Sequence, residues 1–162
     1  MNTDIFLLLG TNLGDRLGNL RIARAEIEAH VGEIVRASSI YRTAAWGKTD
    51  QPDFYNQVIC IDSTLSAQHI LTKIFNIEEH MGRERLEKWG ARLIDIDILF
   101  IGNAQIDSPS LKVPHPEIVN RRFTLVPLAE IAHDFVHPSN QKKISELLEE
   151  CPDHLPVEKV TD

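Results

Sequence analysis

The stretch LIDIDILF, residues 93–100, decides the fold and poses the first question about function. It is an aliphatic run, typical of a buried strand, that carries two carboxylates, Asp95 and Asp97. Side chains of a strand alternate between its two faces, so both acids point to one side and the isoleucines beside them to the other. We therefore expect a strand over 93–101 whose apolar face packs under helices and whose opposite face presents two negative charges.

The residues upstream of this strand predict two helices and three further strands. In each predicted helix, apolar residues recur at spacings of three and four, which marks one buried face. Ser66 suits the N-cap of the second helix, and Gly32 and Gly82 suit the helix ends. The expected helices cover 20–31 and 66–81, and the expected strands cover 4–9, 34–43 and 54–63.

The predicted order β-α-β-β-α-β is that of the ferredoxin-like fold. This α+β architecture is an antiparallel sheet with helices on one face. A C-terminal extension follows, with a weaker hairpin near 106–113, an apolar segment near 123–131 and a small helix near 144–149. We expect residues 1–162 to form a single domain, because this length suits one domain better than two.

Composition and charge argue against several classes of protein. The chain has 17 Lys and Arg against 24 Asp and Glu, and a net charge of -7 disfavours sequence-independent binding of nucleic acid. Its two cysteines, Cys60 and Cys151, lie far apart, as expected in a reducing compartment. The apolar runs are too short to span a bilayer, and the first residues do not resemble a signal peptide. We expect a monomeric cytoplasmic protein.

The carboxylate pair has a simple interpretation and a functional one. A half-covered antiparallel sheet presents a polar face to water, and Asp95 and Asp97 would fit such a face. Two like charges on one strand face repel each other, however, and a divalent cation would turn that repulsion into binding. Mg²⁺ favours one or two carboxylates together with substrate phosphates and water, which suits this pair.

A basic loop leads into the strand and favours the functional interpretation. Its basic residues are Arg83, Arg85, Lys88 and Arg92. Guanidinium groups bind phosphate oxygens in a bidentate way, and flanking glycines would let the loop close over a ligand. The simpler alternative is a solvated loop whose glutamates balance part of the charge. Farther along, His115 and Arg121 are further candidates for phosphate contacts, although a single histidine is more often structural.

A second set of residues suits a flat heterocycle. Phe54 and Asn56 lie two apart on a predicted strand and share one face, while Trp46 and Phe123 lie in predicted loops. Aromatic side chains are usually core residues, which is the simpler interpretation. Two rings can also hold a planar ring system between them while an amide hydrogen-bonds its edge.

Together these motifs resemble the 6-hydroxymethyl-7,8-dihydropterin pyrophosphokinase family of folate biosynthesis, over nearly the whole chain. The central motif, WGARLIDIDILF, is long and specific. The other stretches that carry the resemblance are LLLGTNLGDR, SSIYRTAAWG, QPDFYNQV, IEEHMGRER and LKVPHPEIVNRRFTLVPLAEIA. The resemblance implies the ferredoxin-like fold and transfer of a diphosphate from ATP to the hydroxymethyl group of the dihydropterin, with release of AMP.

The resemblance also implies roles for individual residues. Asp95 and Asp97 match the ligands of two Mg²⁺ ions, and Arg83 and Arg92 match catalytic contacts to the phosphates. The implied ATP site consists of Glu78, Arg83, Arg85, Trp89, Arg92, Ile98, Lys112, His115 and Arg121. The implied pterin pocket, in which the two phenylalanines stack on the ring, consists of Thr43, Trp46, Phe54, Asn56 and Phe123.

The sequence departs from the family pattern in three places. Ala44 and Ala45 stand where some members have prolines, which predicts a less rigid pterin loop. Phe54 stands where tyrosine is common, so the stacking ring is kept and a hydroxyl is lost. The basic loop is slightly shortened, and the roles of Arg85 and Lys88 transfer least directly.

Two other classes of function suit a ferredoxin-like sheet. Such a sheet can bind single-stranded RNA through aromatics on its central strands, but the acidic charge and the missing aromatic RNA-binding motif disfavour this. Paired aspartates on such a sheet also serve nucleotidyl transfer, which would release pyrophosphate from ATP where diphosphate transfer releases AMP.

Overall fold

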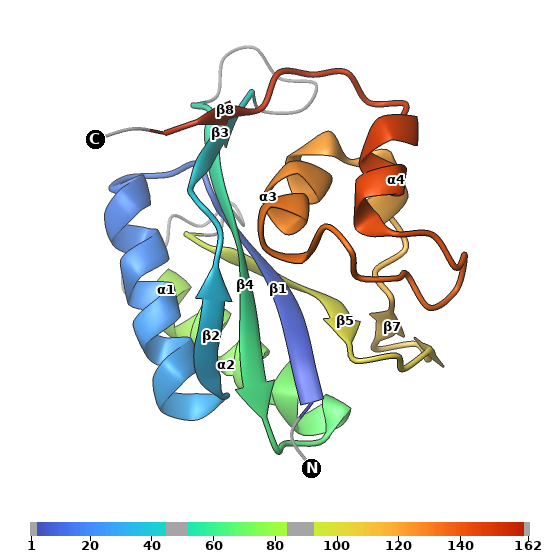
Figure 1. Ribbon diagram of the computed structural model, residues 1–162. Coiled ribbons are helices and arrows are strands. Elements are labelled where there is room, and N and C mark those ends of the chain that lie inside the picture. Colours follow the sequence, from blue (N-terminus) through green and yellow to red (C-terminus); the bar gives the residue numbers. More distant parts are fainter. Residues whose placement is uncertain (1–2, 45–51, 84–92, 161–162) are drawn as a thin grey trace.

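The structure is a computed structural model that describes residues 3–44, 52–83 and 93–160 (Figure 1). Its first seven elements are β1 (Thr3–Thr11), α1 (Arg16–His30), β2 (Glu33–Ala37), β3 (Tyr41–Thr43), β4 (Phe54–Ser63), α2 (Ala67–Arg83) and β5 (Asp95–Ile101). The C-terminal part adds β6 (Ile106–Asp107), β7 (Lys112–Val113), a 3-10 helix (Ile118–Asn120), α3 (Arg122–Ala132), α4 (Ile144–Glu150) and β8 (Glu158–Lys159). Among the helices described, none has the length and apolar composition needed to cross a membrane.

The main sheet is antiparallel and has the strand order β5-β1-β4-β3-β8, with β2 also paired to β4. β2 and β3 follow one another along the outer side of β4, so together they occupy one strand position. The four core positions therefore have the order expected of a β-α-β-β-α-β chain, which confirms the predicted ferredoxin-like core.

The strand expected over 34–43 is divided in two at Ser38. The hydroxyl of Ser38 accepts a hydrogen bond from the Val58 amide (3.0 Å), while the Ser38 amide donates to the Val58 carbonyl (2.8 Å). A side-chain oxygen thus replaces a backbone carbonyl at this point of the ladder, and regular pairing with β4 resumes at Tyr41. The division places Thr43, at the end of β3, opposite Phe54.

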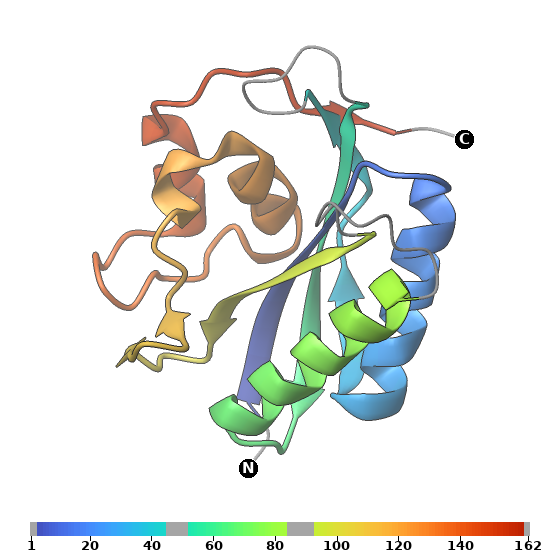
Figure 2. The ribbon, with the colours of Figure 1, turned by 180° about the vertical axis from the view of Figure 1, so that it is seen from behind.

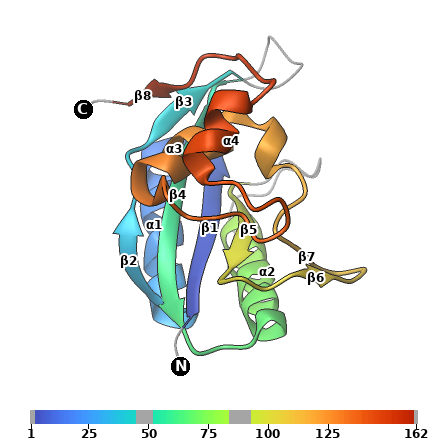
Figure 3. The same ribbon diagram turned by 45° about the vertical axis from the view of Figure 1, so that its right-hand side comes forward.

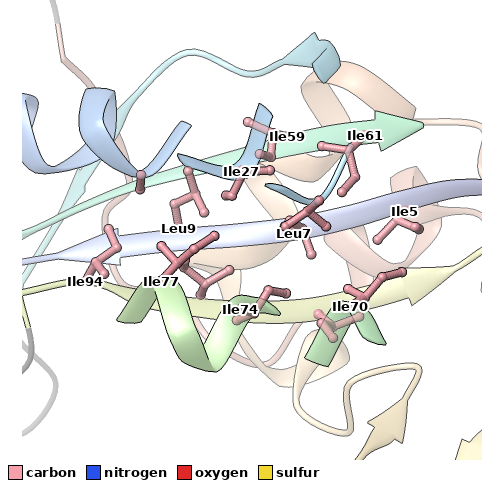
Figure 4. Close-up of a cluster of buried hydrophobic side chains, with 14 of the residues drawn as sticks. Ile5, Leu7, Leu9, Ile27, Ile59, Ile61, Ile70, Ile74, Ile77 and Ile94 are labelled. Atoms are coloured by element: carbon pink, nitrogen blue, oxygen red, sulfur yellow. The ribbon is translucent and has the colours of Figure 1, made fainter. Parts of the chain in front are cut away.

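Helices α1 and α2 cover one face of the sheet, as Figure 2 shows from behind. The main core lies between them and the strands, and it contains Ile5, Leu7 and Leu9 of β1 (Figure 4). The apolar faces predicted for the two helices lie in this core. One runs from Leu20 to Val31 and the other from Ile70 to Met81. The predicted N-cap is present as well, because the Ser66 hydroxyl accepts the His69 amide (3.2 Å).

Helices α3 and α4 pack on the opposite face of the sheet (Figure 3). A second core lies beneath them, with Phe6 and Leu8 of β1 packed against Leu125 and Leu128 of α3. The C-terminal extension therefore covers much of the face that carries Asp95 and Asp97, and the simple interpretation of a solvated face does not hold for this sheet.

An irregularity in the pairing of β1 with β5 marks the change from one core to the other. Leu7 is opposite Ile98 and Phe6 is opposite Phe100, so Leu99 is an extra residue in β5. A bulge of this kind turns the following side chains to the other face of the sheet. Ile98 accordingly belongs to the main core, whereas Leu99 and Phe100 both belong to the second core.

Candidate active site

Asp95 and Asp97 line two cavities at once, one of about 430 Å³ and one of about 400 Å³. Both carboxylates are half-buried, and their strand positions are opposite Gly10 and Leu8 of β1. The predicted alternation is present, because the flanking isoleucines Ile94 and Ile96 lie in the main core. A ligand in either cavity would therefore meet the same pair of negative charges.

The first cavity contains most of the predicted pterin residues that the structure describes. Thr43, Phe54, Asn56 and Phe123 all line it. Asn56 is almost fully buried and its side-chain amide donates to the Thr43 hydroxyl (3.0 Å). The carboxamide is therefore held in one orientation on the cavity wall, where it can form hydrogen bonds with the edge of a planar heterocycle. The aromatic rings of the same cavity can stack on the faces of that heterocycle.

The second cavity contains four residues of the predicted ATP site. Glu78, Ile98, Lys112 and His115 line it together with the carboxylate pair. Glu78, near the end of α2, accepts a hydrogen bond from the Ile96 amide (2.8 Å) and so ties the helix to the edge strand. This cavity combines an apolar wall with cationic and imidazole groups, which suits a nucleotide with its phosphates.

Arg121 is the exception among the predicted ATP residues, because it lines the first cavity. Its guanidinium lies 5.7 Å from the centre of the Phe123 ring, within the range of a cation–π contact. The guanidinium is therefore next to an aromatic wall of the first cavity, and the phosphate contact implied for it stays a prediction.

A hydrogen bond to the ring of His115 determines which of its two nitrogens can act as a donor. Its Nδ1 accepts the Glu117 amide (3.1 Å), which leaves Nε2 as the atom that carries the proton in the neutral ring. Burial lowers the pKa of His115, and the carboxylate of Asp97 offsets part of that effect. The imidazole is thus neutral in the free protein near pH 7, with one N–H available for a phosphate oxygen.

A buried polar network fixes the approach to β5. The Thr11 hydroxyl donates to the carbonyl of Leu93 (2.6 Å), and the Asn19 amide donates to Thr11 (3.1 Å) and to the carbonyl of Leu13 (2.8 Å). Thr11 and Asn19 are both almost fully buried. The network connects β1 and α1 to the residue two places before Asp95, so it helps to position the carboxylate pair.

Several predicted site residues lie outside the described residues. They are Trp46, Arg85, Trp89 and Arg92, together with Lys88 of the basic loop and the side chain of Arg83. The roles implied for them stay predictions.

Sequence reasoning missed one side of the first cavity. Glu117 and Asn120 line it from the two ends of the 3-10 helix, and Asp153, Leu155 and Val157 line it from the C-terminal tail. Glu117 and Asn120 lie between the predicted residues His115 and Arg121 in the sequence. That proximity was the only signal that could have placed them in the site. The tail residues have no periodic pattern and follow Pro152, so nothing in the sequence connected them with the site.

The chemistry of the carboxylate pair fits Mg²⁺. Among the described residues, no group of three or more His, Cys, Asp or Glu side chains forms a metal site. Mg²⁺ does not require such a group, because it is usually bound by one or two carboxylates while substrate phosphates and water complete its coordination. Two half-buried carboxylates on one strand face, between two cavities, meet that requirement.

Comparison with known families and relatives gives consistent results. The model of the family described as 7,8-dihydro-6-hydroxymethylpterin-pyrophosphokinase matches residues 6–133. A protein of Synechocystis named 2-amino-4-hydroxy-6-hydroxymethyldihydropteridine pyrophosphokinase is 44% identical over 143 residues, which cover 88% of this chain and 73% of that protein. A Haemophilus influenzae protein of the same name is 39% identical over 150 residues, 92% of this chain and 93% of the relative.

Solved structures of similar fold include the wild-type HPPK-DHPS of Plasmodium falciparum with pteroate. It superposes with a TM-score of 0.78 at 17% sequence identity, over 93% of this chain. The present chain corresponds to 44% of that longer one, so it spans less than half of its length. At this identity the likeness concerns the fold alone.

Proposed function

Because this chain belongs to the 7,8-dihydro-6-hydroxymethylpterin-pyrophosphokinase family, we propose that its two cavities hold the pterin and ATP on either side of a magnesium-binding carboxylate pair. The enzyme transfers a diphosphate from ATP to the hydroxymethyl group of 6-hydroxymethyl-7,8-dihydropterin, which is a step in the synthesis of folate. The single observation that supports the proposed geometry is that Asp95 and Asp97 line both cavities.

The assignment of the cavities follows from their chemistry. The dihydropterin is a flat heterocycle with a polar edge, and the first cavity presents aromatic rings beside the held amide of Asn56. ATP carries a base and a charged tail, and the second cavity leads from an apolar wall to Lys112 and His115. With each substrate so placed, the hydroxymethyl group and the phosphate tail would meet at the carboxylates.

Positioning and neutralisation of charge would account for most of the catalysis. The hydroxyl oxygen attacks the β-phosphorus, the bond from that phosphorus to the oxygen of AMP breaks, and the hydroxyl proton passes to solvent. Mg²⁺ held by Asp95 and Asp97 would screen the negative charge that grows on the phosphate oxygens. His115 and Arg121 would donate to the tail and align it, and we predict that the hydroxyl needs no dedicated base.

Analysis of the products tests this function directly. With ATP, Mg²⁺ and 6-hydroxymethyl-7,8-dihydropterin, we expect AMP and the pterin diphosphate in equal amounts, and little AMP when the pterin is omitted. Release of pyrophosphate in place of AMP would show nucleotidyl transfer and would overturn the proposal.

Two expectations about the state of the protein also stay proposals. We infer a monomer and a cytoplasmic location from the sequence, and sedimentation and cell fractionation would check them. Dependence on Mg²⁺ is likewise a proposal, and loss of activity with EDTA that is restored by Mg²⁺ would support it.

A further inference from the structure

The C-terminal tail crosses the side of the first cavity and is held firmly at both ends. We call residues 153–159 the tail strap. They follow α4 and end in β8, beside β3, as Figure 1 and Figure 3 show. The strap lies beyond residues 6–133, where the chain matches the family model, so the family match does not assign it a role.

The first anchor of the strap is Asp153. One oxygen of its carboxylate accepts the amide of Arg122 at the start of α3 (3.0 Å), and the other accepts the amide of Leu155 (3.0 Å). Arg122 is the neighbour of Phe123, whose ring lines the first cavity. Asp153 therefore fixes the strap next to one of the predicted stacking residues.

The second anchor is the pairing of β8 with β3. Arg42 is opposite Glu158 and Tyr41 is opposite Lys159, and the Val160 amide donates to the carbonyl of Ile40 (2.8 Å). β3 ends at Thr43, whose hydroxyl accepts the buried amide of Asn56. The strap is thus paired with β3, the strand whose last residue, Thr43, lines the first cavity.

Between the two anchors, two apolar side chains line the first cavity. They are Leu155 and Val157, and Leu155 remains 39% exposed. An exposed leucine on a segment held by hydrogen bonds at both ends gains little from folding alone, whereas a ligand in the cavity would remove its apolar surface from water.

We propose that Leu155 and Val157 are further substrate-contacting residues, which form an apolar wall against the dihydropterin ring beside the predicted stacking phenylalanines. The inference rests on the proposed function, because it takes the occupant of the first cavity to be the pterin. Both side chains offer only carbon to the ligand, so they add affinity for the ring and form no hydrogen bonds with the phosphate tail.

Substitutions in the strap test the inference. In Leu155→Ala we expect the Kd for 6-hydroxymethylpterin, titrated by its fluorescence, to rise about fivefold to tenfold, which corresponds to roughly 1–1.4 kcal/mol. The KM for the dihydropterin should rise by a similar factor while the KM for ATP stays within about twofold. Leu155→Ile should keep the Kd for 6-hydroxymethylpterin and the KM for the dihydropterin close to those of the wild type, since isoleucine retains the apolar volume.

A neighbour in the strap provides the matched control. His154 is exposed and does not line the cavity, so His154→Ala should bind the pterin like the wild type. If a Leu155→Ala, Val157→Ala double variant binds the pterin with wild-type affinity, the inference is overturned while the proposed function stands. If the wild type itself binds no pterin and forms no AMP, both are overturned together.

Discussion

Gly10 lies between the two halves of the site. In the sheet it is opposite Asn56 on one side and Asp95 on the other. A Cβ atom at this position would lie 2.8 Å from Oδ1 of Asn56, closer than the two atoms can approach. The absence of a side chain at Gly10 therefore leaves room for the carboxamide that we assign to the pterin edge.

Gly10→Ala should displace that carboxamide and weaken binding of the pterin. We expect the Kd for 6-hydroxymethylpterin to rise about tenfold, roughly the loss of one hydrogen bond to the ligand. The Kd for a non-hydrolysable ATP analogue should change little, since Gly10 lines only the first cavity. Equal weakening of both ligands would contradict this account of Gly10.

His115 should make ATP binding depend on pH. Burial keeps its pKa below the ordinary value in the free protein, whereas a bound polyphosphate favours the protonated ring and raises the pKa against the cost of losing the hydrogen bond from the Glu117 amide to Nδ1. ATP binding therefore takes up protons in the range near and below pH 6.5, and the affinity rises as the pH falls.

Calorimetry in buffers of different ionisation enthalpy measures that uptake of protons. His115→Gln retains a donor but does not titrate, so its uptake should be lower than that of the wild type across the same range. Titration of ATP itself contributes equally to both proteins and cancels in the difference. Identical uptake by the two proteins would remove His115 from the phosphate contacts.

At the scale of elements, a cluster of hydrogen bonds joins α3 to the edge of the sheet. Glu130 of α3 accepts from the hydroxyl of Tyr41 in β3 (2.6 Å) and from the amide and hydroxyl of Ser39 (3.1 and 2.9 Å). Burial first, and then the bond to Glu130, raise the pKa of Tyr41 to about 12. The cluster fixes the helix that carries Phe123 relative to the strand that carries Thr43.

A double-mutant cycle measures the coupling between the helix and the strand. Glu130→Ala should lower the free energy of unfolding by about 0.5–1.5 kcal/mol, because the part-buried Tyr41 hydroxyl exchanges its carboxylate acceptor for water. In a Tyr41→Phe background the same change should cost clearly less, and the difference is the coupling energy. Denaturant unfolding provides all four values, and strict additivity would show that the contact contributes nothing.

The strands also show which structural features can be predicted from the sequence and which cannot. The repeated isoleucines of 93–101 predicted the orientation of Asp95 and Asp97, since a regular alternation shows in the sequence. The extra residue at Leu99 was not predicted, because a bulge depends on the pairing partner and leaves the composition unchanged. The division of the strand at Ser38 depends likewise on a contact with a distant residue, Val58.

At the scale of the whole molecule, the two cavities should behave as separate binding sites that share one wall. Phe123→Ala should raise the Kd for the pterin by about tenfold or more and leave that for ATP nearly unchanged. Lys112→Ala should do the reverse, with a smaller effect, because the Lys112 side chain is 57% exposed. Titrations of each ligand with each variant check this separation, and a variant that weakened both ligands equally would contradict it.

The limits of sequence reasoning at this scale follow from chain connectivity. The core order and the carboxylate pair come from short, periodic segments, and both were predicted. The second core and the tail strap depend on how the extension folds back over the sheet, which brings Leu155 and Val157 beside residues of β3 and β4. No local pattern in the sequence encodes that return.

The central claim is that Asp95 and Asp97 hold Mg²⁺ against the ATP tail at the junction of the two cavities. The rate of AMP formation by Asp97→Asn, at saturating Mg²⁺, ATP and dihydropterin, tests it most directly. We expect a fall of about 1,000-fold or more, equivalent to roughly 4 kcal/mol of transition-state stabilisation, in a protein with unchanged Tm. A folded Asp97→Asn variant that forms AMP at close to the wild-type rate would contradict the claim.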